Sequence, residues 1–343
     1  MKDSISRLLL TALATMAFAV PGEARQTDTT FVANGNPLVR YKYTADPGAL
    51  VDTDGTMYVY AGCDVCPPPH NYYKIDEWTV FSSKDLRTWT EHPVPLRATD
   101  FEWASGEAWA SQVVRKGDKY YWYVTVEHKD IDGKRGKGIG VAVSDSPVGP
   151  FKDAKGSALV TNDMTTNYTG IGWDDIDPTA WIAPDGTAYL IWGNTQCYIA
   201  KLKDNMVELD SDIRPIRIDG INTPAHPQPG KPQYTEAPWI HVYKGKYYLS
   251  FALEFPEKIG YATADNIWGP YTFKGVINEL AGNCNTNHQA IVEKDGKWYF
   301  VYHNGGADVN GGSFRRSVCI EEMRYDRKGN IVPIVMTSNG IWK

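Results

Sequence analysis

The stretch EAPWIHVYKGKYYLSFAL, residues 236–253, contains the pattern that decides the fold. The stretch begins with an acidic residue close to proline, and an apolar segment follows. The dipeptide Lys244-Gly245 separates this segment from a second one rich in tyrosine. Glycine readily adopts the positive φ angle of a tight hairpin turn, and the flanking residues are strand formers. The stretch therefore predicts two antiparallel strands joined by a short turn.

Related stretches occur four more times: ADPGALVDTDGTMYVYAG at 45–62, AWASQVVRKGDKYYWYVTVE at 108–127, DPTAWIAPDGTAYLIWGN at 177–194 and HQAIVEKDGKWYFVYHN at 288–304. A further strand-like segment follows each copy, so each unit is expected to form about four antiparallel strands. Such sheets repeated around one axis predict an all-β, five-bladed β-propeller with a single catalytic domain. A β-sandwich is the alternative that regularly spaced strands alone leave open.

The composition narrows the class of protein. The chain has 343 residues, of which 42% are hydrophobic, enough to bury a sizeable core. Its formal net charge is −6, and lysine and arginine are spread along the chain without long basic runs. A nucleic-acid-binding protein usually has a basic stripe, so nucleic acid is not an expected partner.

The N-terminus has the pattern of an export signal. Lys2 and Arg7 precede an apolar run at 8–20, and small residues follow. This pattern predicts a signal peptide at 1–25 and a propeller domain at 26–343, in a protein exported to the periplasm, the cell surface or the medium. No later segment is apolar enough to predict a membrane span.

Five cysteines, an odd number, do not form a disulfide framework. Cys63 and Cys66 form a single C-x-x-C motif, and no second such motif completes a zinc site. We expect this pair to be either a disulfide or two unreactive thiols.

Three of the units open with an acid at a corresponding position: Asp46, Asp177 and Glu236. The first strand of a propeller blade lines the central channel, so these side chains are expected to converge at one end of it. Proline after the acid fits the start of a strand and is expected to hold the preceding residue extended. One such acid could simply open a strand, but three gathered like charges repel, and folding gives no reason for them. The pattern indicates a functional site.

Glycoside hydrolysis requires such a set of acids. One carboxylic acid protonates the departing oxygen, and a second carboxylate activates water or attacks the sugar. A third charge can raise the pKa of the acid and orient it. Acids on different blades can stand about 6.5–9.5 Å apart, which admits a water molecule and favours inversion of the anomeric configuration.

Four stretches carry a resemblance to a known family: 36–51, 175–193, 234–249 and 285–303. Together they are similar to glycoside hydrolase family 43, the five-bladed propeller enzymes of arabinan and xylan breakdown, from about Asn36 to the C-terminus. The resemblance implies that Asp46 is the general base and Glu236 the general acid. It implies that Asp177 raises the pKa of that acid and orients it.

The resemblance also implies weaker assignments. His288 matches a channel histidine that lies beside a calcium ion or ordered waters, so the resemblance implies either a structural Ca²⁺ or ordered waters in the channel, and the reaction requires no cofactor. Either Arg315 or Arg316 is expected to contact substrate. The remaining candidates for sugar binding, each of which could instead be core or a solvated loop residue, are Trp109, Trp173, Trp192, Glu107, Asp174 and Asp175.

The leading functional hypothesis is an exo-acting, inverting α-L-arabinofuranosidase that releases arabinose from arabinan or arabinoxylan. A β-xylosidase, or an endo-acting arabinanase or xylanase, is the alternative within the family. A non-catalytic carbohydrate-binding propeller is the alternative from another class, but it would not need all three acids. The expected partner is a plant polysaccharide or oligosaccharide, and the protein is expected to be a monomer.

Overall fold

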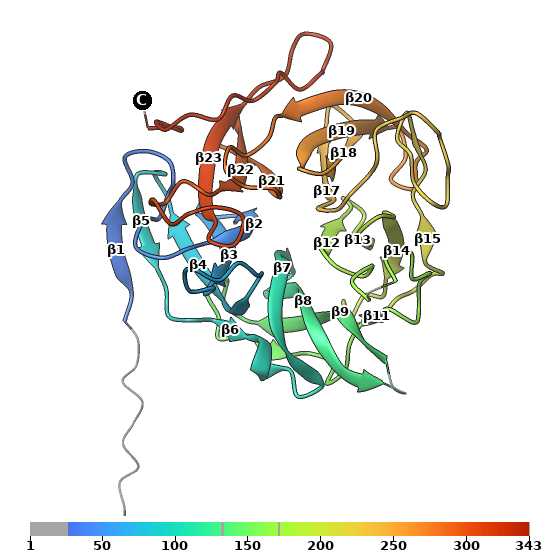
Figure 1. The fold of residues 1–343 in the computed structure, drawn as a ribbon, viewed down its shortest axis with the longest axis horizontal. Helices are drawn as coiled ribbons and strands as arrows, with labels where there is room; N and C mark the ends of the chain where they lie inside the picture. The colour runs from blue at the N-terminus through green and yellow to red at the C-terminus, as the bar shows by residue number, and fades with distance from the viewer. Residues whose placement is uncertain (1–26, 132–133, 171, 343) are drawn as a thin grey trace, which may run out of the picture.

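The computed structural model describes residues 27–131, 134–170 and 172–342. The proposed signal peptide lies outside this part of the chain. Within it, five β-sheets are arranged in a ring around a central channel (Figure 1). The all-β, five-bladed propeller that the repeats predict is therefore confirmed, and the alternative of a β-sandwich is wrong.

Each blade is an antiparallel meander whose first long strand lies nearest the channel (Figure 1). Blade 1 comprises β1 (Thr29–Val32), β2 (Ala45–Val51), β3 (Met57–Asp64), β4 (Ile75–Ser83), β5 (Thr88–Glu91) and β6 (Leu96–Arg97). A 3-10 turn, η1 (Ala98–Asp100), leads to blade 2, which comprises β7 (Ala104–Lys116), β8 (Lys119–Ile131), β9 (Lys134–Ser144), β10 (Lys152–Asp153) and β11 (Val160–Thr161).

Blade 3 comprises β12 (Thr179–Ile182), β13 (Ala188–Trp192), β14 (Tyr198–Leu202) and β15 (Arg214–Pro215). Blade 4 comprises β16 (Ile218–Asp219), β17 (Trp239–Tyr243), β18 (Lys246–Leu253), β19 (Lys258–Ala264) and β20 (Tyr271–Asn278), and its outer strand β16 runs parallel to β20. Blade 5 comprises β21 (Gln289–Lys294), β22 (Lys297–Asn304) and β23 (Ser317–Met323). The described part of blade 5 thus has three strands where the repeat predicts four.

The predicted hairpin turns are confirmed. The two-residue loop Lys244-Gly245 joins β17 to β18, and Asp295-Gly296 joins β21 to β22. All four residues have positive φ angles between 48° and 76°. Two successive positive φ values match the right-handed twist of the flanking strands, which explains why glycine stands second in each turn.

The free edge of β23 is covered by the segment that joins β1 to β2. The amides of Leu38 and Thr44 donate hydrogen bonds to the carbonyls of Val318 and Arg316, each at 2.8 Å. The side chain of Asn36 adds bonds to both the amide and the carbonyl of Ile320. The ring is therefore closed by residues from both ends of the described chain, and backbone groups on the edge of blade 5 find hydrogen-bond partners.

Hydrophobic side chains fill the spaces between neighbouring blades. Blades 1 and 2 share one such cluster, which includes Trp78 and Trp122, and blades 3 and 4 share another around Ile191 and Phe251. These cores fix the five inner strands relative to one another. In the described residues, no helix is long and apolar enough to cross a membrane.

Candidate active site

A cavity of about 500 Å³ opens where the inner strands begin, and it brings the three predicted acids together. Asp46 comes from β2, Asp177 lies just before β12, and Glu236 lies just before β17. They reach one cavity from blades 1, 3 and 4 because the inner strands of these blades begin at the same end of the channel, and their later residues line the cavity at the other end. Convergence of the acids, expected from the repeat, is what the structure shows.

The backbone at these acids differs from the prediction. Asp46 and Asp177 precede proline, yet their φ angles are +48° and +59°, so neither is extended. In blade 4 the residue with this conformation is Ala237, at φ +52°, and not Glu236. Glu236 therefore stands one residue earlier than its two counterparts. Non-glycine residues with positive φ cost about 1–3 kcal/mol each and cluster at functional sites.

Asp46 is held by a buried arginine. Nη1 of Arg316 donates a hydrogen bond to Oδ1 of Asp46 at 2.6 Å, and Arg316 in turn makes three bonds to Asp64 at 2.8–2.9 Å. Burial raises the pKa of Asp46 to about 6, although the positive charge of Arg316 acts in the opposite direction. Asp46 is thus a carboxylate that ionises near neutrality beside a fixed cation.

Glu236 lines the same cavity and accepts a 2.6 Å hydrogen bond from Nδ2 of Asn194. Glu236 as a whole is partly exposed through the cavity, whereas its carboxyl group is buried among protein atoms. Burial, followed by the negative charge of Asp46, raises the pKa of Glu236 to about 7. Glu236 therefore retains a proton at pH values where Asp46 has lost its own.

Asp177 is linked to Glu236 through the backbone of the next residue. Its Oδ2 accepts a 2.9 Å hydrogen bond from the amide of Ala237, the residue that follows Glu236. Its own amide donates to Oγ1 of Thr125 at 3.0 Å. Burial and the nearby Glu236 and Asp46 raise the pKa of Asp177 well above its ordinary value. The carboxyl group of Asp177 is therefore placed to fix the backbone that carries Glu236.

His288 lies in the channel with Nδ1 3.7 Å from Oδ2 of Asp177. Burial and the charge of Arg316 lower the pKa of His288 to about 3, so the imidazole is neutral at physiological pH. No group of three or more histidine, cysteine or acidic residues in the described ranges could hold a metal. Calcium prefers six to eight oxygen ligands, and the described side chains do not build that cage. A calcium ion held through water beside His288 stays a prediction, and no step of the reaction is derived through it.

The structure distinguishes the two adjacent arginines. Arg316 lines the cavity, whereas Arg315 turns away and donates to the carbonyl of His70 at 2.9 Å and to Oδ1 of Asn71 at 3.1 Å. Arg315 also donates to the carbonyl of Asn310 at 2.5 Å, so it ties together two loops beside the cavity. Of the two candidates, Arg316 is therefore the one that faces the cavity, because the guanidinium of Arg315 is occupied by loop carbonyls.

Replacing Arg316 with methionine is expected to lower the free energy of unfolding by about 3–5 kcal/mol, because Asp46 and Asp64 would stay buried without their cation. Urea denaturation measures this loss. Arg324→Met is the matched control, since Arg324 forms an exposed ion pair with Glu322 and its loss is expected to cost about 1 kcal/mol or less. Equal losses in the two variants would contradict this role of Arg316.

Two of the three predicted tryptophans line the cavity. Trp109 and Trp173 stand with their ring centroids 6.4 Å apart, and Trp173 is 39% exposed. Lys137 lies 4.1 Å from the centroid of the Trp109 ring and forms an ion pair with Glu107, which also lines the cavity. This wall offers both flat apolar surface and hydrogen-bonding groups, as a sugar ring requires.

The prediction that Trp192 binds sugar is wrong. It is 0% exposed and packs in the core between blades 2 and 3, with Nε1 donating to Oδ1 of Asp175 at 2.7 Å. It therefore has no surface on which a sugar could stack. Asp174 and Asp175 are buried as well, and their carboxylates accept bonds from loop residues 165–169. They hold that loop in place, so they neither bind a sugar nor solvate a loop.

Several cavity residues were not predicted. The repeat pattern does not mark them because they lie on irregular loops or at strand ends: Tyr73, Asn194, Phe255 and Glu257. Tyr73 packs its ring on Phe314 at 4.7 Å and against the guanidinium of Arg316 at 5.2 Å. Glu257 is a further acid of this cavity and is buried.

All five cysteines are free and buried, so Cys63 and Cys66 do not form a disulfide. Burial raises the pKa of the Cys63 thiol to about 12. A thiol that stays protonated is a poor nucleophile, which agrees with the expectation of unreactive thiols.

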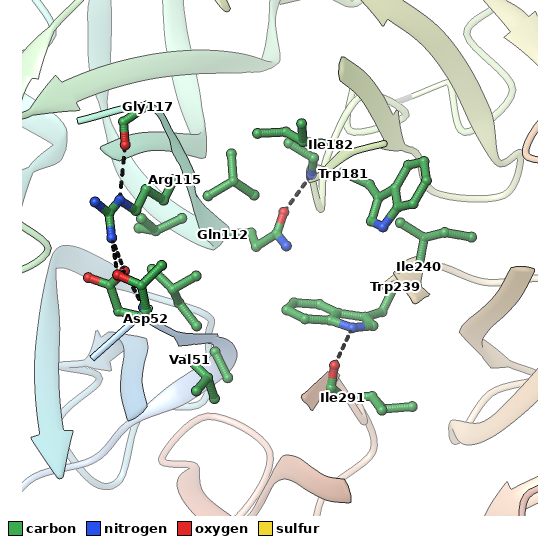
Figure 2. A pocket seen from close by; sticks show the side chains of 16 residues that line it. Val51, Asp52, Gln112, Arg115, Gly117, Trp181, Ile182, Trp239, Ile240 and Ile291 are labelled. Carbon is green, nitrogen blue, oxygen red and sulfur yellow. Dashed lines mark hydrogen bonds and ion pairs between the residues drawn. The ribbon is translucent and has the colours of Figure 1, made fainter. Parts of the chain in front are cut away.

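A second cavity, of about 560 Å³, lies at the other end of the channel, where the inner strands finish. Figure 2 shows its mostly apolar lining, with Trp181, Trp239 and the ion pair between Arg115 and Asp52. None of the three converging acids lines it. The chemistry therefore belongs to the cavity at the start of the strands, although the second cavity is slightly larger.

Carboxyl groups that reach one cavity from different blades, with raised pKa values, are the groups that glycoside hydrolysis requires. The chain belongs to glycosyl hydrolases family 43, whose family model matches residues 34–331. The resemblance found in the sequence is thereby confirmed, and the protein is an enzyme.

Individual relatives agree with this assignment. A xylosidase/arabinosidase of Bacteroides ovatus is 32% identical, over 87% of this chain and 96% of the relative. An arabinoxylan arabinofuranohydrolase of Paenibacillus polymyxa is 30% identical over 90% of this chain, which spans about half of that longer relative (52%). Among solved structures, one similar chain is a β-xylosidase/α-arabinofuranosidase from a compost metagenome, in complex with xylotriose in a calcium-free form. It superposes with a TM-score of 0.76 at 29% identity, and the match covers 89% of this chain and 98% of that one.

Proposed function

We propose that the protein is an inverting α-L-arabinofuranosidase that removes arabinose from arabinan or arabinoxylan. The observation that supports this most strongly is that Asp46 and Glu236, two acids with raised pKa values, reach one cavity from different blades. Asp46 has a pKa of about 6 and Glu236 one of about 7, so between these values one is charged and the other neutral. This is the state that an acid–base pair for glycoside hydrolysis requires.

In the proposed reaction the proton of Glu236 passes to the glycosidic oxygen as the bond to the anomeric carbon breaks, and the electron pair of that bond stays on the oxygen. A water molecule attacks the anomeric carbon from the opposite side and gives its proton to Asp46. The Arg316 guanidinium keeps Asp46 oriented and ionised beforehand. Asp177 holds the backbone beside Glu236 through the amide of Ala237.

The sugar is proposed from the walls of the cavity and from the relatives. Trp109, Trp173 and the 66% exposed Phe255 supply apolar faces for a sugar ring. The relatives are named for release of arabinose, of xylose or of both. A β-xylosidase is the second candidate, and the xylotriose bound in the metagenomic neighbour favours it.

A release assay tests the proposal. Arabinan, arabinoxylan, xylo-oligosaccharides and the nitrophenyl arabinofuranoside and xyloside are offered, and the freed sugars are identified by chromatography. Arabinose from the arabinosides is the expected result, whereas xylose as the main product would favour the second candidate. Internal cleavage into longer fragments would indicate endo action. No release from any substrate would contradict the proposed function.

The pH dependence of kcat/KM on arabinoxylan oligosaccharides is expected to be a narrow bell. Activity rises with pH as the base Asp46 ionises, at about pH 6, and falls as the acid Glu236 loses its proton, at about pH 7. Initial rates measured from pH 4 to pH 9 check this. A rate that stays flat across both limbs would contradict the assignment of these two groups.

We also propose that the apolar run at 8–20 directs export and that the mature enzyme acts as a monomer on polysaccharide outside the cytoplasm. Mass spectrometry of the N-terminus after secretion, and light scattering of the mature protein, test the two parts. An intact N-terminus in the cell fraction would contradict export.

A further inference from the structure

A smaller cavity, of about 240 Å³, adjoins the one that holds the three acids. The two cavities share the side chains of Glu107, Trp109 and Trp173, and the rest of the smaller one comes from β8, from β9 and from the loop before blade 3. We call it the side pocket. Cavities for drug-sized ligands measure about 300–1,000 Å³, so the side pocket suits a single ring.

Glu107 stands at the border of the two cavities on strained backbone. Its φ angle is +49°, the conformation of Asp46 at +48° and of Asp177 at +59°. The pairing of β7 with β8 shifts register on both sides of Gly106, and such bulges redirect side chains beside active sites. Left-handed backbone at a residue other than glycine is costly and clusters at functional sites. Glu107 is therefore the blade 2 counterpart of the acids of blades 1 and 3.

Lys137 is the fixed cation of the side pocket. It is 6% exposed, and it forms ion pairs with Glu107 and, at 3.4 Å, with Glu127, which stands directly opposite on β8. Its Nζ lies 4.1 Å from the centroid of the Trp109 ring. Its amide donates to the carbonyl of Gly172 at 2.7 Å, which ties the loop before blade 3 to β9. A lysine is seldom buried this deeply unless it is paired, so these contacts hold the ammonium in one place.

The groups that face the side pocket suit a neutral sugar. Each carboxylate gives one oxygen, Oε2, to Lys137, and no hydrogen bond from the described residues reaches Oε1 of Glu107 or of Glu127. A sugar hydroxyl can donate to such an oxygen and accept from the ammonium. Trp173, 39% exposed, adds an apolar face. One cation against two carboxylates leaves a negative charge, which disfavours a sugar that carries its own carboxylate.

We propose that the side pocket binds a second, uncleaved pentose unit of the substrate and that Lys137, Glu107 and Glu127 recognise its hydroxyl groups. The proposal rests on the proposed function, since it assumes that the first pentose occupies the cavity with the acids. It gives the enzyme a preference for oligosaccharides over glycosides that carry a single sugar. The ligand is prepaid in rigidity, because the charged groups are already held by one another before it binds.

Lys137→Met tests this. Methionine keeps an apolar stem against Trp109 but removes the charge and the donor. For arabinoxylan oligosaccharides the KM is expected to rise about tenfold or more, the worth of one hydrogen bond to a charged group, with little change in kcat. On a dinitrophenyl arabinofuranoside, which carries one sugar, the change is expected to stay below about threefold. Lys119→Met is the matched control, because Lys119 forms an exposed ion pair with Asp145 in the same blade.

The result on the two substrates separates recognition from structural support. Equal rises in KM, or a loss of kcat on both substrates, would show that Lys137 only supports the tryptophan wall and would overturn the proposal. An unchanged KM for oligosaccharides would overturn it as well. Should Lys137→Met not fold, Glu127→Gln decides, because it keeps the pair between Lys137 and Glu107. Its KM for oligosaccharides is expected to rise about threefold, and by more than its KM for the dinitrophenyl substrate.

Binding without turnover gives a second readout. Titration calorimetry of Glu236→Gln with a neutral arabinoxylan oligosaccharide is expected to show tighter binding than with one that carries glucuronic acid. Adding Lys137→Met is expected to weaken the binding of the neutral one about tenfold. Equal or tighter binding of the acidic oligosaccharide would overturn the assignment of a neutral pentose. The release assay on the wild type decides the proposed function, so the two hypotheses can fail separately.

Discussion

Glu236→Gln is expected to lower kcat on arabinoxylan oligosaccharides by about 10²–10⁴-fold, the usual contribution of a general acid. The amide has the size of the carboxyl group, but it cannot donate a proton to the glycosidic oxygen. Nδ2 of Asn194 can still donate to the remaining side-chain oxygen, so the cavity should keep its shape. Rates with natural oligosaccharides and with the dinitrophenyl arabinofuranoside measure the effect.

The loss in Glu236→Gln is expected to depend strongly on the leaving group. A dinitrophenolate departs without protonation, so that substrate should be cleaved at close to the wild-type rate. Thermal unfolding serves as the control for folding. If the variant kept full activity on oligosaccharides, Glu236 would not be the acid, and a sugar-binding propeller would become the better account.

Asp46→Asn is expected to lower kcat by a similar factor, about 10²–10⁴-fold, but on both kinds of substrate. The asparagine side chain cannot take a proton from the attacking water, and water must attack whatever the leaving group is. Its side-chain oxygen can still accept from Arg316, which limits the structural change. Steady-state rates on the same two substrates check the expectation.

The comparison between the two variants is the informative control. A loss that depends on the leaving group in Glu236→Gln and a uniform loss in Asp46→Asn distinguish an acid from a base. If Asp46→Asn spared the dinitrophenyl substrate, the roles of the two residues would be exchanged. Circular dichroism should be unchanged in both variants.

Much of the fold could be predicted because the pattern repeats. Turns such as Asp295-Gly296 need glycine at a fixed place, and tyrosine-rich strands follow them, so the sequence itself marks each hairpin. Asp46 and Asp177 could be found because each stands before proline at the start of an inner strand. Glu236 could be found too, although the structure places it one residue out of phase, with Ala237 in the left-handed conformation.

The remaining site residues depend on packing that local sequence does not encode. Trp192 and Trp109 both lie in aromatic-rich strands, yet Trp192 packs between blades and Trp109 faces the cavity. Arg315 and Arg316 are adjacent in the irregular segment before β23, yet Arg316 lines the cavity and Arg315 donates to loop carbonyls. Glu257 belongs to no repeated motif, and the turn between β18 and β19 places it in the cavity. These features become visible once the blades are assembled.

The configuration of the first product tests the central claim most directly. Proton NMR during hydrolysis of the best substrate from the release assay follows the freed sugar before its anomers equilibrate. We expect the anomer opposite to that of the cleaved bond, because the proposed base Asp46 would activate water on the face away from the proposed acid Glu236. Release of the anomer with the same configuration as the cleaved bond would contradict it, since that outcome requires a covalent intermediate and a nucleophile in place of a base.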